Sequence, residues 1–291
     1  MKDYYISCFA MIILLLSSCF SYAGNDEKGI YDAVYGEEGT AFTVATGSPG
    51  SLGLLKALAE PFCGMNNCRI NWLNMGSGES LNALKEGKAE MIMVHSPQAE
   101  KKAVQEGWAV NRTLLGGNEF FIIGPESDPA GIGHARSAKQ AFIMIANAGA
   151  KFFSRGDNSG THKKEMMIWE DTGINPDGTW YVVTGDLMWP TLSRCDYEQG
   201  YFMTDSSTFI AKKTEIKNLK VLFRGDPMLI NLYHAIAAPE GKTPKKIYSL
   251  ISKFIAFIET EEGQKILRDY GKEECGFELY MDLETARNYE Q

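Results

Sequence analysis

The sequence has little basic charge and only one long hydrophobic run, and each shortage excludes a class of protein. The apolar run, residues 6–16, lies near the N-terminus and the mean hydropathy is −0.21, which excludes a protein with several membrane spans. The 29 Lys and Arg against 37 Asp and Glu give a formal net charge of −8. A general nucleic-acid binder needs a basic surface, so no nucleic-acid partner is expected.

Histidine and cysteine are also scarce, which weakens the case for a metal site. The histidines His95, His134, His162 and His234 are scattered, and the one close cysteine pair has no second C-x-x-C pair to complete a zinc site. A G-x-S-x-G motif is missing, and nothing orients Ser159 and His162 as a hydrolase would require. We therefore expect no metal, no cofactor, no catalytic residues and no enzyme activity.

The first 23 residues predict export from the cytoplasm as a signal peptide. The run of residues 6–16 is too short to span a bilayer and fits the hydrophobic part of a secretory signal. Two cleavage sites remain open: S-Y-A at 21–23 is a small-x-small site, and L-S-S-C at 16–19 resembles a lipobox ending at Cys19. The protein is expected in the periplasm or as a lipoprotein on the outer face of the bacterial inner membrane.

Four cysteines outside the signal peptide are candidates for disulfides, because an exported chain meets oxidising conditions. Cys63 and Cys68 enclose a turn-rich tetrapeptide and form one candidate pair. Cys195 and Cys275 form the second, which requires that the fold bring them together.

The rest of the chain alternates strand and helix patterns over a length typical of about two domains. Strands are predicted at residues 41–46, 69–75, 90–95, 120–125, 151–154, 180–183, 201–204, 220–223 and 232–238. Helices are predicted after each of the first three strands and at residues 137–148, 158–171, 186–198, 206–213, 245–260 and 262–270. Successive strand, loop and helix units favour an α/β fold with a parallel sheet.

Small hydroxyl residues and glycines stand where five of these strands end and helices begin. They are T-G-S at 46–48, G-S-G at 76–78, H-S at 95–96, N-S-G-T at 158–161 and T-D-S-S-T at 204–208. In open α/β sheets ligands bind beyond the carboxyl ends of the strands, where helix N-termini offer N–H groups and a partial positive charge. Ordinary helix caps use the same residues, so an anion site and simple capping both remain open.

The segment S-R-G-D-N-S-G-T-H-K-K-E at residues 154–165 is the strongest candidate for an anion site. Arg155 could offer a forked guanidinium to an oxyanion, and Ser159 and Thr161 could donate hydroxyl hydrogens. Asp157 or Asn158 would cap the helix. In the alternative, Arg155 pairs with Asp157 or another acid and has no ligand role. The net charge does not exclude the site, because it acts on solubility and long-range steering rather than on the field within one cleft.

This segment resembles the signature of the periplasmic tungstate-binding proteins of ABC importers. Residues 90–100 resemble that family's D-V-x-x-V-H-A-P-x-A-E segment, residues 107–112 its E-G-x-G-x-x-R segment, and residues 201–211 its Y-T-L-T-D-R-G-T-Y-L-A segment. Residues 120–132 and 222–227 resemble the two crossings between the family's domains. The resemblance covers residues 42–270, most of the chain.

The resemblance implies a two-lobed class II periplasmic binding protein, each lobe a central, mixed, mostly parallel sheet flanked by helices. One lobe would comprise residues 40–123 and 226–291 and the other residues 124–225, with a ligand cleft between them. A monomer that delivers a small oxyanion to the membrane subunits of an ABC permease is expected. The ligand-binding residues implied by matching position are Thr46, Ser48, Ser77, Ser96, Arg155, Ser159, Gly160 and Thr161, with Thr184 and Thr204 as weaker candidates.

Four positions depart from the family's pattern and bear on which anion is bound. Ala45 and Gly47 remove hydroxyl donors from a T-T-T-S loop, Ser206 replaces an arginine, and Glu79 brings a carboxylate near the cleft unless it caps its helix. Each missing bond to a charged group could cost about 1.5–3 kcal/mol. Tungstate is the first candidate, molybdate the second, and another oxyanion or a small carboxylate the third. A sensor that presents its ligand to a receptor is the alternative to transport.

Overall fold

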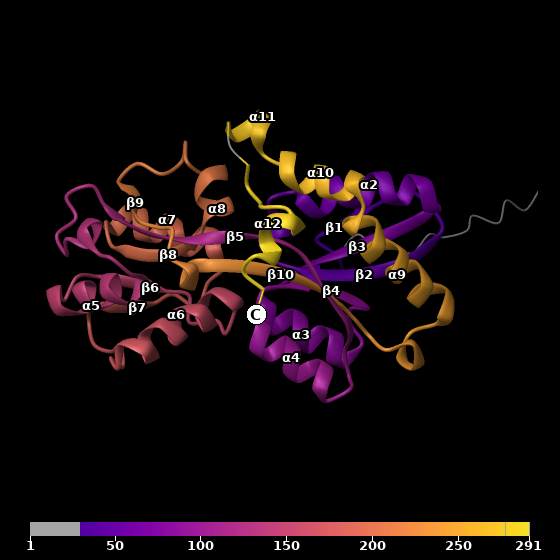
Figure 1. The fold of residues 1–291 in the computed structure, drawn as a ribbon, viewed down its shortest axis with the longest axis horizontal. Coiled ribbons are helices and arrows are strands. Elements are labelled where there is room, and N and C mark those ends of the chain that lie inside the picture. Colours follow the sequence, from indigo (N-terminus) through magenta and orange to yellow (C-terminus); the bar gives the residue numbers. More distant parts are fainter. Residues whose placement is uncertain (1–29, 277, 291) are drawn as a thin grey trace, which may run out of the picture.

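The protein folds into two lobes that lie side by side and are joined by strands (Figure 1). The computed structural model describes residues 30–276 and 278–290. The predicted signal peptide, with Cys19 and both cleavage sites, lies outside the described residues. None of the described helices is long and apolar enough to cross a membrane.

Lobe 1 is built on a mixed sheet. Its strands are β1 (Ala33–Tyr35), β2 (Thr40–Thr46), β3 (Cys68–Asn74), β4 (Met91–Val94) and β10 (Ile230–Ala237). The order is β1-β3-β2-β4-β10, in which β2 runs parallel to β3 and β4, and β1 and β10 run antiparallel to their neighbours. Every residue of β4 is buried, as the apolar run predicts for a central strand.

Helices cover both faces of this sheet (Figure 1). The helices of lobe 1 are α1 (Ser48–Ser51), α2 (Leu54–Asn66), α3 (Ser77–Glu86), α4 (Pro97–Gln105), α9 (Lys245–Glu259), α10 (Glu261–Asp269), α11 (Lys272–Cys275) and α12 (Leu283–Arg287). On one face α2 and α9 bury Phe62 and Phe254, whose ring centroids are 4.9 Å apart, in one cluster with Phe42. On the other face α3 and α4 bury Leu84 and Ala103 in a separate cluster.

Lobe 2 contains a second mixed sheet. Its strands are the second half of β5 (Val110–Pro125), β6 (Phe152–Ser154), β7 (Tyr181–Val183), β8 (Tyr201–Asp205) and β9 (Leu219–Phe223). Its helices are α5 (Ala138–Ala148), α6 (Gly160–Thr172), α7 (Met188–Glu198) and α8 (Ser206–Ala211). Phe142 and Trp169, with ring centroids 4.5 Å apart, lie in the core beneath α5 and α6, whereas Leu192 and Phe209 belong to the cluster beneath α7 and α8.

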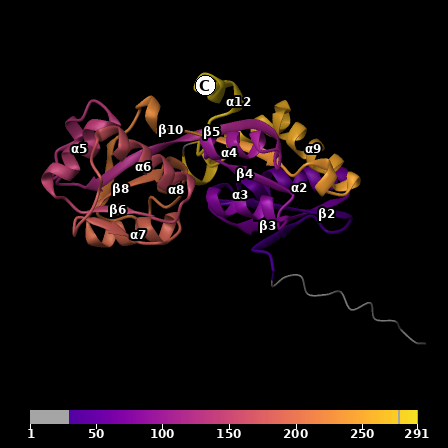
Figure 2. The ribbon, with the colours of Figure 1, turned by 90° about the horizontal axis from the view of Figure 1, so that it is seen from below.

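One strand, β5, belongs to both lobes (Figure 2). Its first half pairs with β10 of lobe 1, and its second half pairs with β8 and β9 of lobe 2. The ten described strands therefore form one continuous sheet. The predicted two-lobed α/β class is confirmed, but β5 is longer than the predicted strand at residues 120–125, and β1, α11 and α12 were not predicted. The division at residues 123 and 225 stays a prediction.

The cysteines bear on the two predicted disulfides. Cys63 in α2 and Cys68 in β3 are buried, and their thiol sulfurs lie 3.1 Å apart without a bond. A disulfide between them stays a prediction. Cys195 lies in the core of lobe 2, and Cys275 packs against the core of lobe 1. The second predicted pair also stays a prediction, and its two members belong to the cores of different lobes.

Candidate functional site

A cavity of about 280 Å³ lies between the two lobes, beyond the carboxyl ends of β2, β3, β4 and β6. Four of the predicted ligand residues line it, namely Ser48 and Ser77 from lobe 1 and Arg155 and Ser159 from lobe 2. The two lobe 1 residues and the two lobe 2 residues are separated by more than 75 residues in the sequence. This position at strand ends is the one that α/β folds use for ligands.

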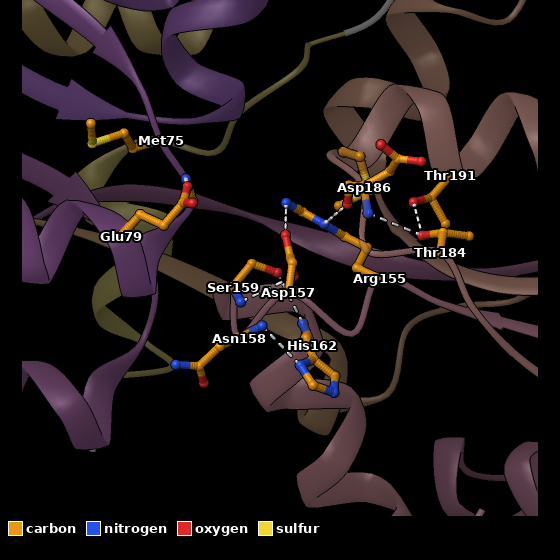
Figure 3. Close-up of polar contacts among 12 residues, drawn as sticks. Met75, Glu79, Arg155, Asp157, Asn158, Ser159, His162, Thr184, Asp186 and Thr191 are labelled. Atoms are coloured by element: carbon orange, nitrogen blue, oxygen red, sulfur yellow. Dashed lines mark hydrogen bonds and ion pairs between the residues drawn. The ribbon is translucent and has the colours of Figure 1, made fainter. Parts of the chain in front are cut away.

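Arg155 follows β6 and is 5% exposed. Its Nε donates to the carbonyl of Asp186 at 3.2 Å, and its Nη2 forms an ion pair with Asp157 (Figure 3). The other oxygen of Asp157 accepts from the backbone N–H of Ser159 at 3.1 Å. Arg155 thus lines the cavity and is paired with Asp157 at the same time, and its role as a ligand residue stays a prediction.

The N-terminus of α6 approaches the cavity from lobe 2. Ser159 is its N-cap, with an Oγ that accepts from the backbone N–H of His162 at 3.3 Å (Figure 3). His162 Nδ1 accepts in turn from the N–H of Asn158 at 3.0 Å. A capping hydroxyl accepts through a lone pair, so its hydrogen can still be donated to a ligand. The end of the helix adds a partial positive charge.

The N-terminus of α3 approaches the same cavity from lobe 1. Ser77 is its first residue, and its Oγ accepts from the backbone N–H of His95 at 3.2 Å. Glu79 folds back so that its carboxylate accepts from the N–H of Gly76 at 3.3 Å (Figure 3). Glu79 is thus a helix cap, which is the arrangement that keeps its charge compatible with an anion in the cleft.

The lobes touch around the cavity. Ser48 Oγ of lobe 1 donates to Asp205 Oδ2 of lobe 2 at 3.4 Å. A Cβ added at Gly78 would lie 2.6 Å from the carbonyl oxygen of Asn158 across the cleft, so glycine at 78 permits this approach. The structure is therefore that of a closed cleft.

Three predicted threonines do not line the cavity, because their hydroxyls bond within the protein. Thr46 Oγ1 donates to the carbonyl of Met93 at 2.8 Å. Thr184 Oγ1 donates to the carbonyl of Ser154 at 3.2 Å, and Thr204 Oγ1 lies 3.4 Å from the Met188 sulfur. These hydroxyls join neighbouring strands and loops, and their role as ligand donors stays a prediction.

Ser96, Gly160 and Thr161 lie beside the cavity without lining it. Ser96 Oγ and Thr161 Oγ1 are buried and have no hydrogen-bond partner among the described residues, and the same is true of His95 Nδ1. Buried polar atoms without a hydrogen-bond partner cost free energy. Three of them where the two lobes meet therefore fit a site that takes a polar ligand.

Cationic groups surround the ring of His95. Burial first, and then the charge of Arg155 with smaller effects of Lys164 and Lys163, lowers the pKa of His95 to about 3. The ring is therefore neutral at pH 7. Burial also lowers the pKa of Lys163 and that of Lys164, since both ammonium groups are partly withdrawn from solvent.

A PBP superfamily domain model matches residues 33–262, which span both lobes. The tungstate-binding protein TupA of Peptoclostridium acidaminophilum is 30% identical over 277 residues, 94% of this chain and 96% of that protein. The chain belongs to the PBP superfamily, in the family of the tungstate-binding proteins.

Two further comparisons agree with this membership. A Haloferax volcanii protein, described as a candidate anion-binding protein of an ABC transporter, is 39% identical over 229 residues, 77% of this chain and 67% of its own. A solved structure described as the tungstate ABC transporter of Geobacter sulfurreducens is 37% identical with a TM-score of 0.73, covering 80% of this chain and all of its own.

The lining residues of this family member that were not predicted as ligand residues include His95, Lys212 and Tyr233. Lys212 ends α8, where its Nζ lies 2.8 Å from Glu215 Oε1 and 4.9 Å from the ring centroid of Trp189. Lys212 therefore brings a second full positive charge to the cavity besides Arg155. The H-S-P sequence at residues 95–97 pointed to His95, because it stands where a strand ends and a helix begins. No local sequence pattern points to Lys212.

Among the described residues, no three His, Cys, Asp or Glu side chains are grouped so that they could hold a metal ion.

Proposed function

We propose that this protein captures an oxyanion, tungstate first and molybdate second, in the cleft between its lobes and delivers it to an ABC permease. Its relatives are named for tungstate binding and for ABC transport. The proposal places the protein outside the cytoplasm, as a monomer that binds and releases its ligand without changing it.

One observation carries the proposal: a guanidinium, three hydroxyls and two helix N-termini converge on one interlobe cavity. Arg155 offers charge-assisted hydrogen bonds, which are about twice as strong as neutral ones. Ser77 and Ser159 accept bonds within the protein, so each can still donate a hydroxyl hydrogen. The helices α3 and α6 add partial positive charge from opposite sides. A tetrahedral dianion needs donors on several sides, and this cavity supplies them from both lobes.

The closed geometry also supports a binding protein rather than a surface anion site. Arg155 is held in place by Asp157 and by the Asp186 carbonyl, so its side chain is ordered before the ligand arrives. An ordered side chain loses little conformational entropy on binding, which favours affinity. Contacts such as Ser48 with Asp205 exist only when the lobes are together, so a ligand that bridges the lobes would stabilise closure.

A ligand screen tests the proposal. The melting temperature of the exported chain is measured with tungstate, molybdate, sulfate, phosphate and small carboxylates, and every positive ligand is confirmed by calorimetry. Tungstate is expected to give the largest rise, because a ligand at 1,000 times its Kd stabilises the folded form by about 4 kcal/mol. A response to carboxylates alone would replace the oxyanion with an organic acid, and silence toward every oxyanion would contradict the proposal.

A further inference from the structure

The ring of His95 in lobe 1 lies against Gly160, the first residue of α6 in lobe 2. An ideal Cβ at Gly160 would lie 2.5 Å from Cε1, 2.6 Å from Nδ1 and 2.8 Å from Nε2 of that ring. Gly160 does not have a positive φ, so its own backbone would accept alanine. The requirement for glycine therefore comes from the opposite lobe, and the lobes meet here because Gly160 has no side chain.

The His95 ring has little room to withdraw from this contact. Its centroid lies 4.9 Å from that of Tyr233 on β10 and 6.0 Å from that of Phe120 on β5. Its backbone N–H donates to Ser77 Oγ. The ring is thus packed between the two strands that connect the lobes on one side and the start of α6 on the other.

The charges that face this ring favour its neutral form. From lobe 2 these are Arg155, Lys163 and Lys164, and each lowers the pKa of His95, although burial is the largest cause. From the connecting strands Tyr233 and Phe120 bring no full charge to the ring, and a hydrogen bond with Asn231 opposes the shift only in part. A protonated ring would be a buried cation facing three others, with Nδ1 lacking a partner among the described residues.

We propose that His95 and Gly160 form a proton-sensitive seam, so that the lobes close over the bound anion only while His95 is neutral. The inference rests on the proposed function, and it adds acid-driven release to it. His95 is a positioning residue in this proposal, since it acts on lobe closure and not on the anion.

The sign and size of the effect follow from linkage. When the lobes separate, Gly160 and the three cations move away, and the ring titrates near its ordinary pKa of about 6.5. The pKa of His95 is lower in the closed form, so closure is fully available above about pH 6.5 and is lost as the pH falls toward 3. Affinity should be weaker at pH 5.5 than at pH 7.5 by up to about tenfold, because the negative charge of the bound anion beside His95 offsets part of the shift.

The first test compares pH profiles. Calorimetry with micromolar tungstate between pH 7.5 and pH 5.5 should show weaker binding of the wild type at the lower pH, by up to about tenfold. His95→Asn should show a flat profile once protonation of the anion, which acts equally on both proteins, is subtracted. His162→Gln, in the same α6 turn, should keep the wild-type slope. A His95→Asn profile as steep as the wild type, or a slope lost with His162→Gln, would overturn the proposal.

The second test uses the contact itself. Gly160→Ala should weaken tungstate binding at pH 7.5 by at least tenfold without lowering the melting temperature of the unliganded protein. In His95→Ala/Gly160→Ala the ring is gone, so affinity should return to that of His95→Ala alone. Gly64→Ala, at a helical glycine whose added Cβ meets nothing within 4 Å, is the matched control and should bind as the wild type. Additive losses in the double variant would refute the seam.

Failure of the seam can be distinguished from failure of the proposed function. If the wild type binds no oxyanion at pH 7.5, the proposed function is wrong, and closure over an anion fails with it. If the wild type binds tungstate but His95→Asn keeps the wild-type pH profile, the seam alone is wrong and the proposed function stands.

Discussion

Replacement of Arg155 by alanine should remove the main attraction between the protein and its anion. The guanidinium is almost fully buried, lines the cavity, and is one of two side chains with a full positive charge found there. A hydrogen bond to a charged group contributes about 1.5–3 kcal/mol. Loss of one such bond to the anion predicts affinity about 10- to 150-fold weaker. Arg155→Lys should recover only part of the lost affinity, because a lysine ammonium lacks the forked pair of donors of a guanidinium.

Asp157 makes this prediction sharper. In Arg155→Ala its carboxylate remains beside the cavity without its ion-pair partner, where it repels an anion. Arg155→Ala/Asp157→Asn should therefore bind tungstate more tightly than Arg155→Ala alone. Asparagine can still accept the bond from the N–H of Ser159, so the start of α6 stays capped. The double-mutant cycle thus separates the charge of Asp157 from its structural contact.

The assay is calorimetric titration with tungstate at pH 7.5, with the melting temperature of each unliganded variant as the check on folding. Arg194→Ala is the matched control, because Arg194 on α7 of the same lobe is 49% exposed and pairs with Glu198 away from the cavity. It should bind as the wild type. A Kd for Arg155→Ala within threefold of the wild type would refute the site.

Three further predictions concern stability. Burial raises the pKa of Glu165 to about 7, so the folded form keeps a proton that the unfolded carboxyl releases near pH 4.5. The free energy of unfolding should therefore fall by about 3 kcal/mol between pH 4.5 and pH 7. Urea unfolding of Glu165→Gln should not show this fall. A Cys63–Cys68 disulfide should make the exported protein lighter than its reduced form by the mass of two hydrogens. The disulfide should add about 2 kcal/mol to the free energy of unfolding, so equal urea midpoints before and after reduction would contradict it. Thr46→Val should lower the free energy of unfolding by about 1 kcal/mol and leave the Kd for tungstate unchanged, because Thr46 Oγ1 bonds to the carbonyl of Met93. A tenfold higher Kd would show that Thr46 contacts the ligand.

The short apolar strands and amphipathic helices could be predicted because their signals are local. The buried run at β4 and the glycine and hydroxyl residues that begin α3 and α6 are examples. The first half of β5 could not be predicted in this way, since polar residues and the pair Gly116-Gly117 interrupt its alternation. Its strand geometry comes from pairing with β10, which is more than 100 residues away.

Only part of the candidate site could be predicted from the sequence. Arg155 and Ser159 share one short segment, so their proximity could be predicted. The direction of a hydroxyl at the end of a strand depends on register, which is why Thr46 turns to β4 instead of the cavity. Lys212 reaches the cavity only because α8 packs where the lobes meet, and no local pattern encodes that contact.

The strand that both lobes share makes the molecule one cooperative unit. If lobe 2 were expressed alone as residues 124–225, it would lack nearly all of β5, and β8 and β9 would each expose an unpaired edge. Such a fragment should aggregate rather than fold. The intact chain should melt in a single transition, because neither sheet can lose its order without breaking the ladder of the other.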